Sequence, residues 1–279
     1  MCSPVPPPTK SFHVLTGGPT PQARLLPSSR DNRLSAGQMT RKSLLIVQHL
    51  DWEGPGGHLL AGLREAGLDF QVAEVWHEAL PALHPFAGMI VLGGSPNVDE
   101  EEQYPYLRPL KAMIRECLAS GRAYLGFCLG HQLLAHVLGC RVEPLPRKSV
   151  GFIRGALTPQ GQAHPAFRGL PERLELFKWH GQGVHPPVPD GVTVLAASDA
   201  TPVEALGLRD HHRVVGLQFD NHADAGDVAR WLHHDREWAL SGAQLDPEAL
   251  IASARTREAA LGRQFRLFLG NFCRLAGLL

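Results

Sequence analysis

The distribution of hydrophobic and polar residues divides the chain into three stretches. Residues 1–41 are rich in Pro, Ser, Thr and Gly and show no hydrophobic period, so this stretch is predicted to be a disordered leader. Met39 stands just before the first apolar run, and we expect translation to begin there. Beyond the leader, short apolar runs first alternate with segments of helical periodicity and later follow one another with only short turns between them.

The alternating stretch predicts a parallel sheet. Its apolar runs contain few polar positions, which is typical of strands covered by helices on both faces. The predicted strands are Ser43–Gln48, Phe70–Val75, Gly88–Leu92 and Ala123–Phe127. The predicted helices are Gly56–Ala66, which ends near Gly67, and Leu107–Ala119. The fold class is therefore α/β, with an open, mostly parallel twisted sheet.

The second half predicts an antiparallel extension of that sheet, because short turns permit antiparallel but not parallel neighbours. Its predicted strands are Val150–Leu157, Leu174–Lys178, Val192–Ala197, Val203–Leu208 and Arg213–Phe219. Two helices follow, Ala225–Trp238 and Glu248–Leu278, and the apolar stripe of the second is expected to pack on its own domain. We expect a main domain over 42–240 and a C-terminal helical extension over 241–279.

Composition restricts the partners of the protein. The 27 basic and 27 acidic residues cancel, so no net field attracts nucleic acid or an anionic membrane. No apolar run reaches the roughly 18–20 residues of a membrane-spanning helix, and we expect a cytoplasmic protein. Five scattered cysteines without a CxxC pair predict reduced thiols, and neither a metal nor a cofactor is expected.

One segment carries a clear chemical signature. Gly126-Phe127-Cys128-Leu129-Gly130-His131-Gln132 follows a buried strand and opens an apolar helix. A cysteine on such a sharp strand-to-helix turn is exposed for attack, and small residues two places on either side let the backbone pass closely. The helix N-terminus favours the thiolate form of the sulfur. Cys128 is therefore the predicted nucleophile, whereas His131, on the elbow helix, is expected to have a packing or capping role.

The elbow resembles the GxCxGxQ motif of class I glutamine amidotransferases, and further segments resemble that family in the same order over about residues 43–237. They are Gly93-Gly94-Ser95-Pro96, Tyr104-Pro105, Trp179-His180-Gly181-Gln182, Val203-Glu204-Ala205 and Gly216-Leu217-Gln218-Phe219. The resemblance is greatest to stand-alone members that are similar to the amidotransferase domain of GMP synthase. It implies a flavodoxin-like sheet and hydrolysis of glutamine to glutamate and ammonia through a thioester on Cys128.

The same resemblance implies roles for the residues around the nucleophile. The backbone N–H groups of Gly94 and Leu129 would form the oxyanion hole. The amino-acid end of the substrate would be held by Gly93, Gln132, His180 and Gly181.

The chain departs from the family at the catalytic base. Members generally carry His and, two residues later, Glu, where this chain has Asp220 and His222. If the chain stays extended past Phe219, both side chains face the Cys128 pocket. We then expect an exchanged pair in which His222 is the base and Asp220 its hydrogen-bonded orienter. His180 ranks behind His222 as a candidate base.

Three functions remain open on these grounds. The first is an active glutaminase that supplies ammonia to a separate synthase. The second is a related cysteine hydrolase that cleaves another γ-glutamyl or small amide. The third possibility is a catalytically impaired pseudoenzyme that binds a metabolite or a partner. The intact elbow favours catalysis, and the displaced histidine favours the pseudoenzyme.

Overall fold

The computed structural model describes residues 42–241 and 245–279, so the predicted leader and the expected start at Met39 lie outside the described residues. In the described part, the strands are β1 (Ser43–Gln48), β2 (Asp69–Glu74), β3 (Gly88–Val91), β4 (Ala123–Phe127), β5 (Arg141–Leu157), β6 (Arg173–His185), β7 (Val192–Ala197), β8 (Ala205–Leu208) and β9 (His211–Leu217). The helices are α1 (Gly57–Glu65), α2 (Leu107–Ala119), α3 (Leu129–Val137), α4 (Pro159–Ala163), α5 (Ala225–His234), α6 (Arg236–Leu240) and α7 (Pro247–Leu275), with a 3-10 turn at Pro165–Phe167.

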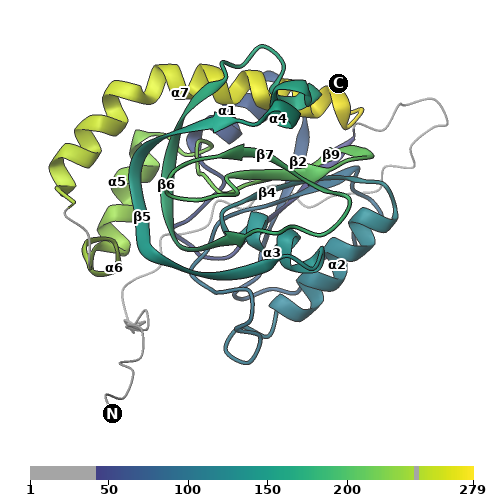
Figure 1. The fold of residues 1–279 in the computed structure, drawn as a ribbon. Helices are drawn as coiled ribbons and strands as arrows, with labels where there is room; N and C mark the ends of the chain where they lie inside the picture. Colours follow the sequence, from purple (N-terminus) through teal and green to yellow (C-terminus); the bar gives the residue numbers. More distant parts are fainter. Residues whose placement is uncertain (1–41, 242–244) are drawn as a thin grey trace. The chain divides into compact units, whose positions relative to one another are not determined.

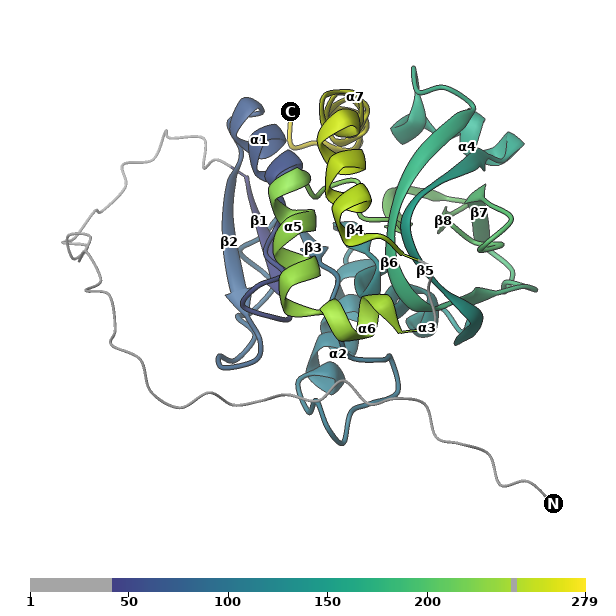
Figure 2. The same cartoon turned by 90° about the vertical axis from the view of Figure 1, so that its left-hand side faces the viewer.

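The strands described form one sheet in the order β2-β1-β3-β4-β9-β8-β7-β5-β6. Pairing is parallel from β2 through β9 and antiparallel from β9 through β6. Figure 2 shows β5 and β6 as a long curved ribbon at the opposite end of the sheet from β2. The predicted parallel sheet with an antiparallel extension is confirmed.

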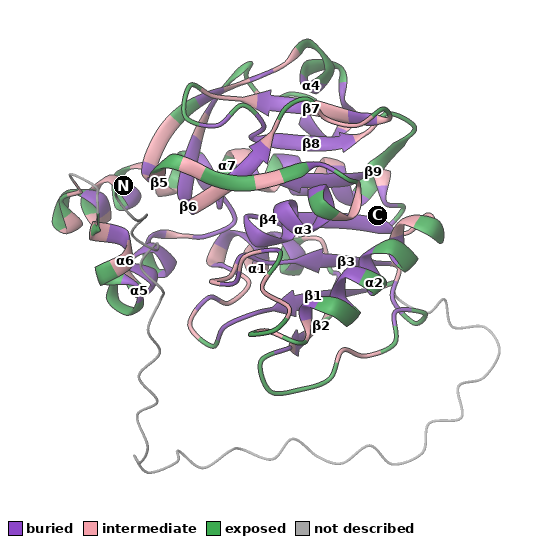
Figure 3. Cartoon of the chain, turned by 60° about the horizontal axis from the view of Figure 1, so that its bottom comes forward, coloured by how far each residue is buried: buried purple, intermediate pink, exposed green. Residues whose placement is uncertain are grey.

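Helices cover both faces of the sheet (Figure 1). Along β1 the side chains alternate strictly, with Leu44 and Ile46 in the core beneath α1 and α7, and Leu45 and Val47 in the core beneath α2 and α3. All four side chains are fully buried, and the central parallel strands β1, β3 and β4 are coloured as buried in Figure 3. Burial on both faces explains why these strands are continuous apolar runs rather than alternating ones.

The first half of the fold agrees closely with its prediction, but the antiparallel part differs. β5 begins at Arg141 rather than Val150 and β6 ends at His185 rather than Lys178. Proline is unfavourable inside a paired strand, but the register of β5 shifts between Pro144 and Ser149, and β5 pairs with β7 only at its last two residues. A bulged strand with one free edge accommodates proline.

The predicted helix Ala225–Trp238 is two helices. α5 ends at His234, and Asp235 leaves the helical conformation with φ −114° and ψ 26° before α6 begins. The carboxylate of Asp235 accepts a hydrogen bond of 3.2 Å from the indole of Trp179. Helical periodicity cannot reveal this contact, because it joins segments that are distant in sequence. The short helix α4 was not predicted from the sequence either.

The C-terminal helix α7 packs on the same sheet as the rest of the fold. Phe265, only 3% exposed, lies with its ring centroid 5.9 Å from that of Phe127 on β4. Phe268, Leu269 and Phe272 continue the buried stripe. The residue before the nucleophile is thus held in place by a helix more than 130 positions away in sequence.

Truncation of this contact is predicted to destabilise the whole fold. Phe265→Ala leaves a cavity against Phe127 and should lower the free energy of unfolding by about 3–5 kcal/mol, measured from urea denaturation midpoints. Leu267→Ala is the matched control on the same helix, because Leu267 is 40% exposed and its loss should change stability by less than about 0.5 kcal/mol. Equal losses in the two variants would contradict the packing of α7 on β4.

Candidate functional site

Cys128 occupies a strained turn between β4 and α3. Its φ of 44° and ψ of −102° make it the one non-glycine residue with positive φ in the part of the chain that the structure describes. A Cβ at Gly126 would lie 2.5 Å from the carbonyl carbon of Gly130, and a Cβ at Gly130 would lie 2.1 Å from Val91 O. Only glycine permits this approach of α3 to the sheet, so the predicted elbow is present in full.

The thiol of Cys128 faces the strand β6 rather than open solvent. Cys128 is 6% exposed, and its Sγ lies 3.8 Å from Trp179 O. Its backbone N–H donates to Leu217 O of β9 at 2.9 Å. These contacts fix the nucleophile between the ends of β4, β6 and β9.

The glycine pair after β3 lies beside the elbow. The N–H of Gly130 donates to Leu92 O at 3.1 Å, which joins the two turns. A Cβ at Gly94 would lie 3.2 Å from a methyl carbon of Leu129, and one at Gly93 would lie 3.4 Å from Cys128 Cβ. The structure therefore brings together the residues predicted for the oxyanion hole, Gly94 and Leu129, and their catalytic role stays a prediction.

The residues predicted to bind substrate also converge. Gln132 Nε2 donates to Gln182 O at 2.9 Å and contacts Gln218 Oε1 at 3.2 Å. The Nδ1 atom of His180 is 2.6 Å from Gln182 O, and Gly181 lies between them on β6. Burial lowers the pKa of His180 well below its ordinary value, with a further contribution from the Lys178 charge, so His180 is a neutral, poor base at pH 7.

The chain does not stay extended after Phe219, so the condition under which both side chains were expected to face Cys128 is not met. The N–H of Ala223 donates to Asp220 O at 2.9 Å, which closes a turn. Asn221 anchors this turn, because its side chain accepts from Phe177 N at 2.8 Å and donates to Glu175 O at 2.8 Å. The two residues of the exchanged pair therefore enter different environments.

Asp220 contacts the same stretch of β6 as the nucleophile. Its N–H donates to Phe177 O at 2.8 Å, so Asp220 and Cys128 contact β6 on either side of Lys178, at Phe177 and Trp179. Asp220 is 1% exposed, and neither carboxyl oxygen has a hydrogen-bond partner among the described residues. Burial, followed by the charge of Glu53, raises the pKa of Asp220 well above its ordinary value, while Lys178 opposes the shift.

His222 packs into the core instead. Its ring stacks on Phe127 with centroids 4.3 Å apart, and its backbone oxygen accepts from the N–H groups of His58 and Leu59 at the start of α1. Burial lowers the pKa of His222 to about 3. Its Nδ1 is 3.9 Å from Asp220 Oδ1, so the two side chains are neighbours but are not hydrogen bonded.

Three charged residues that border the site had no role predicted from the sequence. Lys178 and Glu204 are fully buried and form an ion pair, and Lys178 interacts electrostatically with Asp220 and Cys128. Burial lowers the pKa of Lys178, and the Glu204 carboxylate opposes that shift. The third residue, Glu53, is 5% exposed in the loop after β1.

These groups share one position in the architecture. Glu53 follows β1, the glycine pair follows β3, Cys128 follows β4 and Asp220 follows β9. All four strands are parallel neighbours, so their carboxyl ends meet at one edge of the sheet, where ligands of open α/β folds bind. A charged residue in the loop after a buried parallel strand was the available signal for Glu53.

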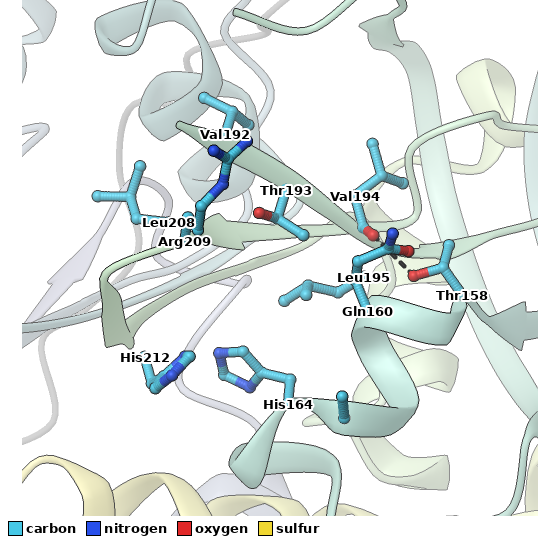
Figure 4. Close-up of a pocket in the computed structure, with 11 residues that line it drawn as sticks. Thr158, Gln160, His164, Val192, Thr193, Val194, Leu195, Leu208, Arg209 and His212 are labelled. Atoms are coloured by element: carbon cyan, nitrogen blue, oxygen red, sulfur yellow. Dashed lines mark hydrogen bonds between the residues drawn. The ribbon is translucent and has the colours of Figure 1, made fainter. Parts of the chain in front are cut away.

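The structure adds three observations to the sequence-based exclusions. No cluster of three or more His, Cys, Asp or Glu suited to a metal occurs within 42–241 and 245–279. In the same ranges, no helix is both long and apolar enough to cross a membrane. A cavity of about 510 Å³ lies between α4, β7 and β8 (Figure 4), where His164, Arg209 and His212 border it, and none of the residues at the Cys128 edge lines it.

The chain matches a family model and several known proteins. The family model described as "Glutamine amidotransferase class-I" matches residues 57–223. The chain is 35% identical over 201 residues to a GMP synthase [glutamine-hydrolyzing] of Thermomicrobium roseum, and the match covers 71% of this chain but only 34% of that longer protein. It is also 31% identical over 175 residues to a protein of Saccharolobus solfataricus that is named as one subunit of a GMP synthase [glutamine-hydrolyzing]. That second match covers 60% of this chain and 83% of the relative.

Solved structures show the same fold. A glutamine amidotransferase of Thermotoga maritima aligns with a TM-score of 0.75 at 27% identity and covers 85% of this chain and 98% of its own. A glutamine amido transferase of Methylobacillus flagellatus aligns with a TM-score of 0.73 at 26% identity. The family model spans more than half of the chain and includes the Cys128 elbow and the 220–222 turn, and the chain therefore belongs to the class I glutamine amidotransferase family.

Proposed function

We propose that the protein hydrolyses glutamine, or a related γ-glutamyl amide, through a thioester on Cys128. The observation that carries the proposal is the strained elbow. It costs folding free energy of the order of 1–3 kcal/mol, and a protein that only binds a ligand has no need of it. Cys128 also lies against the glycine pair that a tetrahedral intermediate requires.

The bond changes follow from this geometry. The sulfur of Cys128 attacks the γ-carbonyl carbon, and the carbonyl oxygen becomes an oxyanion held by the N–H groups of Gly94 and Leu129. Collapse of the intermediate expels ammonia and leaves the thioester. Water then attacks the same carbon, and glutamate departs as the thiol is restored.

Asp220 is the group that we assign to proton transfer at sulfur. An ordinary Asp, with a pKa near 3.9, is a weak base toward a thiol near 8.5. Burial and the Glu53 charge raise the pKa of Asp220 and so reduce that mismatch, which is the condition for efficient general acid–base catalysis. The carboxylate takes the thiol proton and returns it to the leaving nitrogen.

Lys178 stabilises the negative charge while it moves. Its ammonium group, paired with Glu204, acts electrostatically on both Asp220 and Cys128. When the proton passes from sulfur to Asp220, the negative charge moves from the Asp220 carboxylate to the Cys128 sulfur. Lys178 interacts with both groups. A fixed cation that serves both positions lowers the energy of each.

His222 is a positioning residue under this proposal. Its neutral ring, stacked on Phe127 and lying 3.9 Å from Asp220 Oδ1, limits where the carboxyl can move. The sequence-based assignment of His222 as the base requires the ring to leave this stack, and it stays an alternative that substitution of the two residues distinguishes.

The proposal extends to a partner. The relative in Saccharolobus solfataricus is named as one subunit of a synthase, and this chain covers 83% of that relative. That name supports a separate synthase chain as the recipient of ammonia.

Selective alkylation tests the nucleophile. A glutamine-like chloroketone should label Cys128 rapidly, as peptide mapping by mass spectrometry would show. Cys117 and Cys273 should stay unlabelled, because burial raises the pKa of each to about 12, and Cys140 is also buried with a raised pKa. Equal labelling of any of these three would refute the assignment, and Cys128→Ser is the control.

Two variants separate the possible bases. Asp220→Asn should lower kcat/KM for glutamine by about 10²–10⁴-fold, whereas His222→Ala should lower it by less than about tenfold, with ammonia and glutamate release as the measurements. The reverse ranking would identify His222 as the base. Rapid labelling of Cys128 together with no release of ammonia from any γ-glutamyl compound would favour the binding-protein alternative.

A further inference from the structure

The cavity between α4, β7 and β8 is separate from the Cys128 site. Its volume of about 510 Å³ lies within the roughly 300–1,000 Å³ that is typical of small-molecule sites. None of the residues assigned to the amidase reaction lines it, so that reaction does not explain why the cavity is there. The chemistry of its own lining decides what it can bind.

The charged and titratable side chains that border this cavity are all basic. Arg209 follows β8, His212 belongs to β9, and His164 lies directly after α4. Asp and Glu are absent from the described residues that line the cavity. A recess bordered by groups of one sign attracts ligands of the opposite sign, so the lining favours an anion.

Arg209 supplies the permanent positive charge of the cavity. Its backbone N–H donates to Gly191 O at 2.9 Å, which ties the turn after β8 to the start of β7. Its side chain is exposed and forms no ion pair or hydrogen bond with another described residue, and Asp210, the next residue, does not line the cavity. A guanidinium group binds carboxylate and phosphate through paired N–H donors. Those donors are available here to a ligand.

His164 supplies a buried hydrogen-bond donor. Its Nδ1 accepts from the N–H of Ala166 at 3.3 Å, so the proton of the neutral ring is on Nε2. Burial lowers the pKa of His164 to about 4, with a further contribution from His212, and the ring is therefore neutral at pH 7. The Nε2 atom has no hydrogen-bond partner among the described residues, although buried polar atoms are almost always paired.

The side chain of His212 packs against this ring and can move. The two rings meet edge to face with their centroids 4.9 Å apart, and Figure 4 shows the two side chains facing one another. His212 is exposed, and exposed side chains change rotamer readily. On β8, Gly207 leaves further room, because a Cβ there would lie 3.8 Å from His164 Nε2. A rotation of His212 thus gives a ligand access to the buried donor.

We propose that this cavity binds a small organic anion whose carboxylate or phosphate group pairs with Arg209. The body of the ligand lies against the apolar part of the lining, which includes Ala163 and Leu195, and an acceptor on it takes the His164 donor. The proposal does not depend on the amidase function, because the two sites share no residue.

Probes that differ in charge test the proposal on the full chain. Isothermal titration calorimetry is carried out with phenyl phosphate, with benzoate and with benzamide, which is the uncharged counterpart of benzoate. At least one anion should bind, with a Kd of the order of 1 mM for so small a ligand, and benzamide should bind about tenfold more weakly or less. The anion that binds more tightly identifies the acid group. Failure of both anions to bind at about 10 mM, or equal binding of benzamide, would overturn the proposal.

Substitution of Arg209 tests the assignment of the acid group. Arg209→Gln should raise the Kd of the anion about 10–100-fold, because it removes a charge-assisted hydrogen bond. Arg213→Gln is the matched control, since Arg213 is an exposed arginine of the same hairpin that donates to Gly121 O at 3.3 Å and does not line the cavity. An unchanged Kd in Arg209→Gln, or an equal loss in Arg213→Gln, would contradict the proposal.

Two further variants locate the bound anion. Ala163→Trp introduces a large side chain into the cavity from an exposed position and should abolish binding without removal of a charge. Cys128→Ser should bind the anion with an unchanged Kd, because Cys128 does not line the cavity. Unchanged binding in Ala163→Trp would overturn the proposal. Loss of binding there, together with unchanged binding in Cys128→Ser, would establish the cavity as the site whether or not the protein hydrolyses glutamine.

Discussion

The site depends on the close contact between the start of α3 and the end of β3. Gly130 passes so near Val91 O that a Cβ would lie 2.1 Å away, and its N–H donates to Leu92 O. This contact forces Cys128 into a conformation with positive φ and places the helix N-terminus over the sheet edge. Because the neighbouring parallel strands keep a fixed register with β4, the residues after β3 and β9 are brought to the sulfur by the same contact.

The sequence predicted the elements whose signal is local. Ala123–Phe127 and Leu107–Ala119 match their predicted bounds, because a continuous apolar run bounded by polar residues and a helical apolar stripe are each complete within one segment. The N-terminal part of β5 contains Pro144 and Pro146, which are unfavourable in a strand, and only its pairing with β6 shows that the bulged edge tolerates them.

The sequence predicted which residues surround Cys128, but not the backbone conformation of the 220–222 segment. The motif residues that were expected near Cys128 do converge there, but Asp220 and His222 lie in a turn, with side chains 3.9 Å apart that are not hydrogen bonded. The turn is anchored by Asn221, whose side-chain amide bonds to Phe177 and Glu175 on β6. Glu53 and Lys178 escaped notice because a charged residue in a loop or strand is ordinary until the structure shows that it is buried.

The presence of aspartate in place of histidine alters the resting state that a cysteine hydrolase can adopt. A thiolate beside a cationic imidazole is a stable ion pair, whereas a thiolate beside two carboxylates is opposed by like charges. Lys178 offsets part of that repulsion, but it is already paired with Glu204. Under the proposed mechanism, the thiol therefore stays protonated at rest and loses its proton only as it attacks.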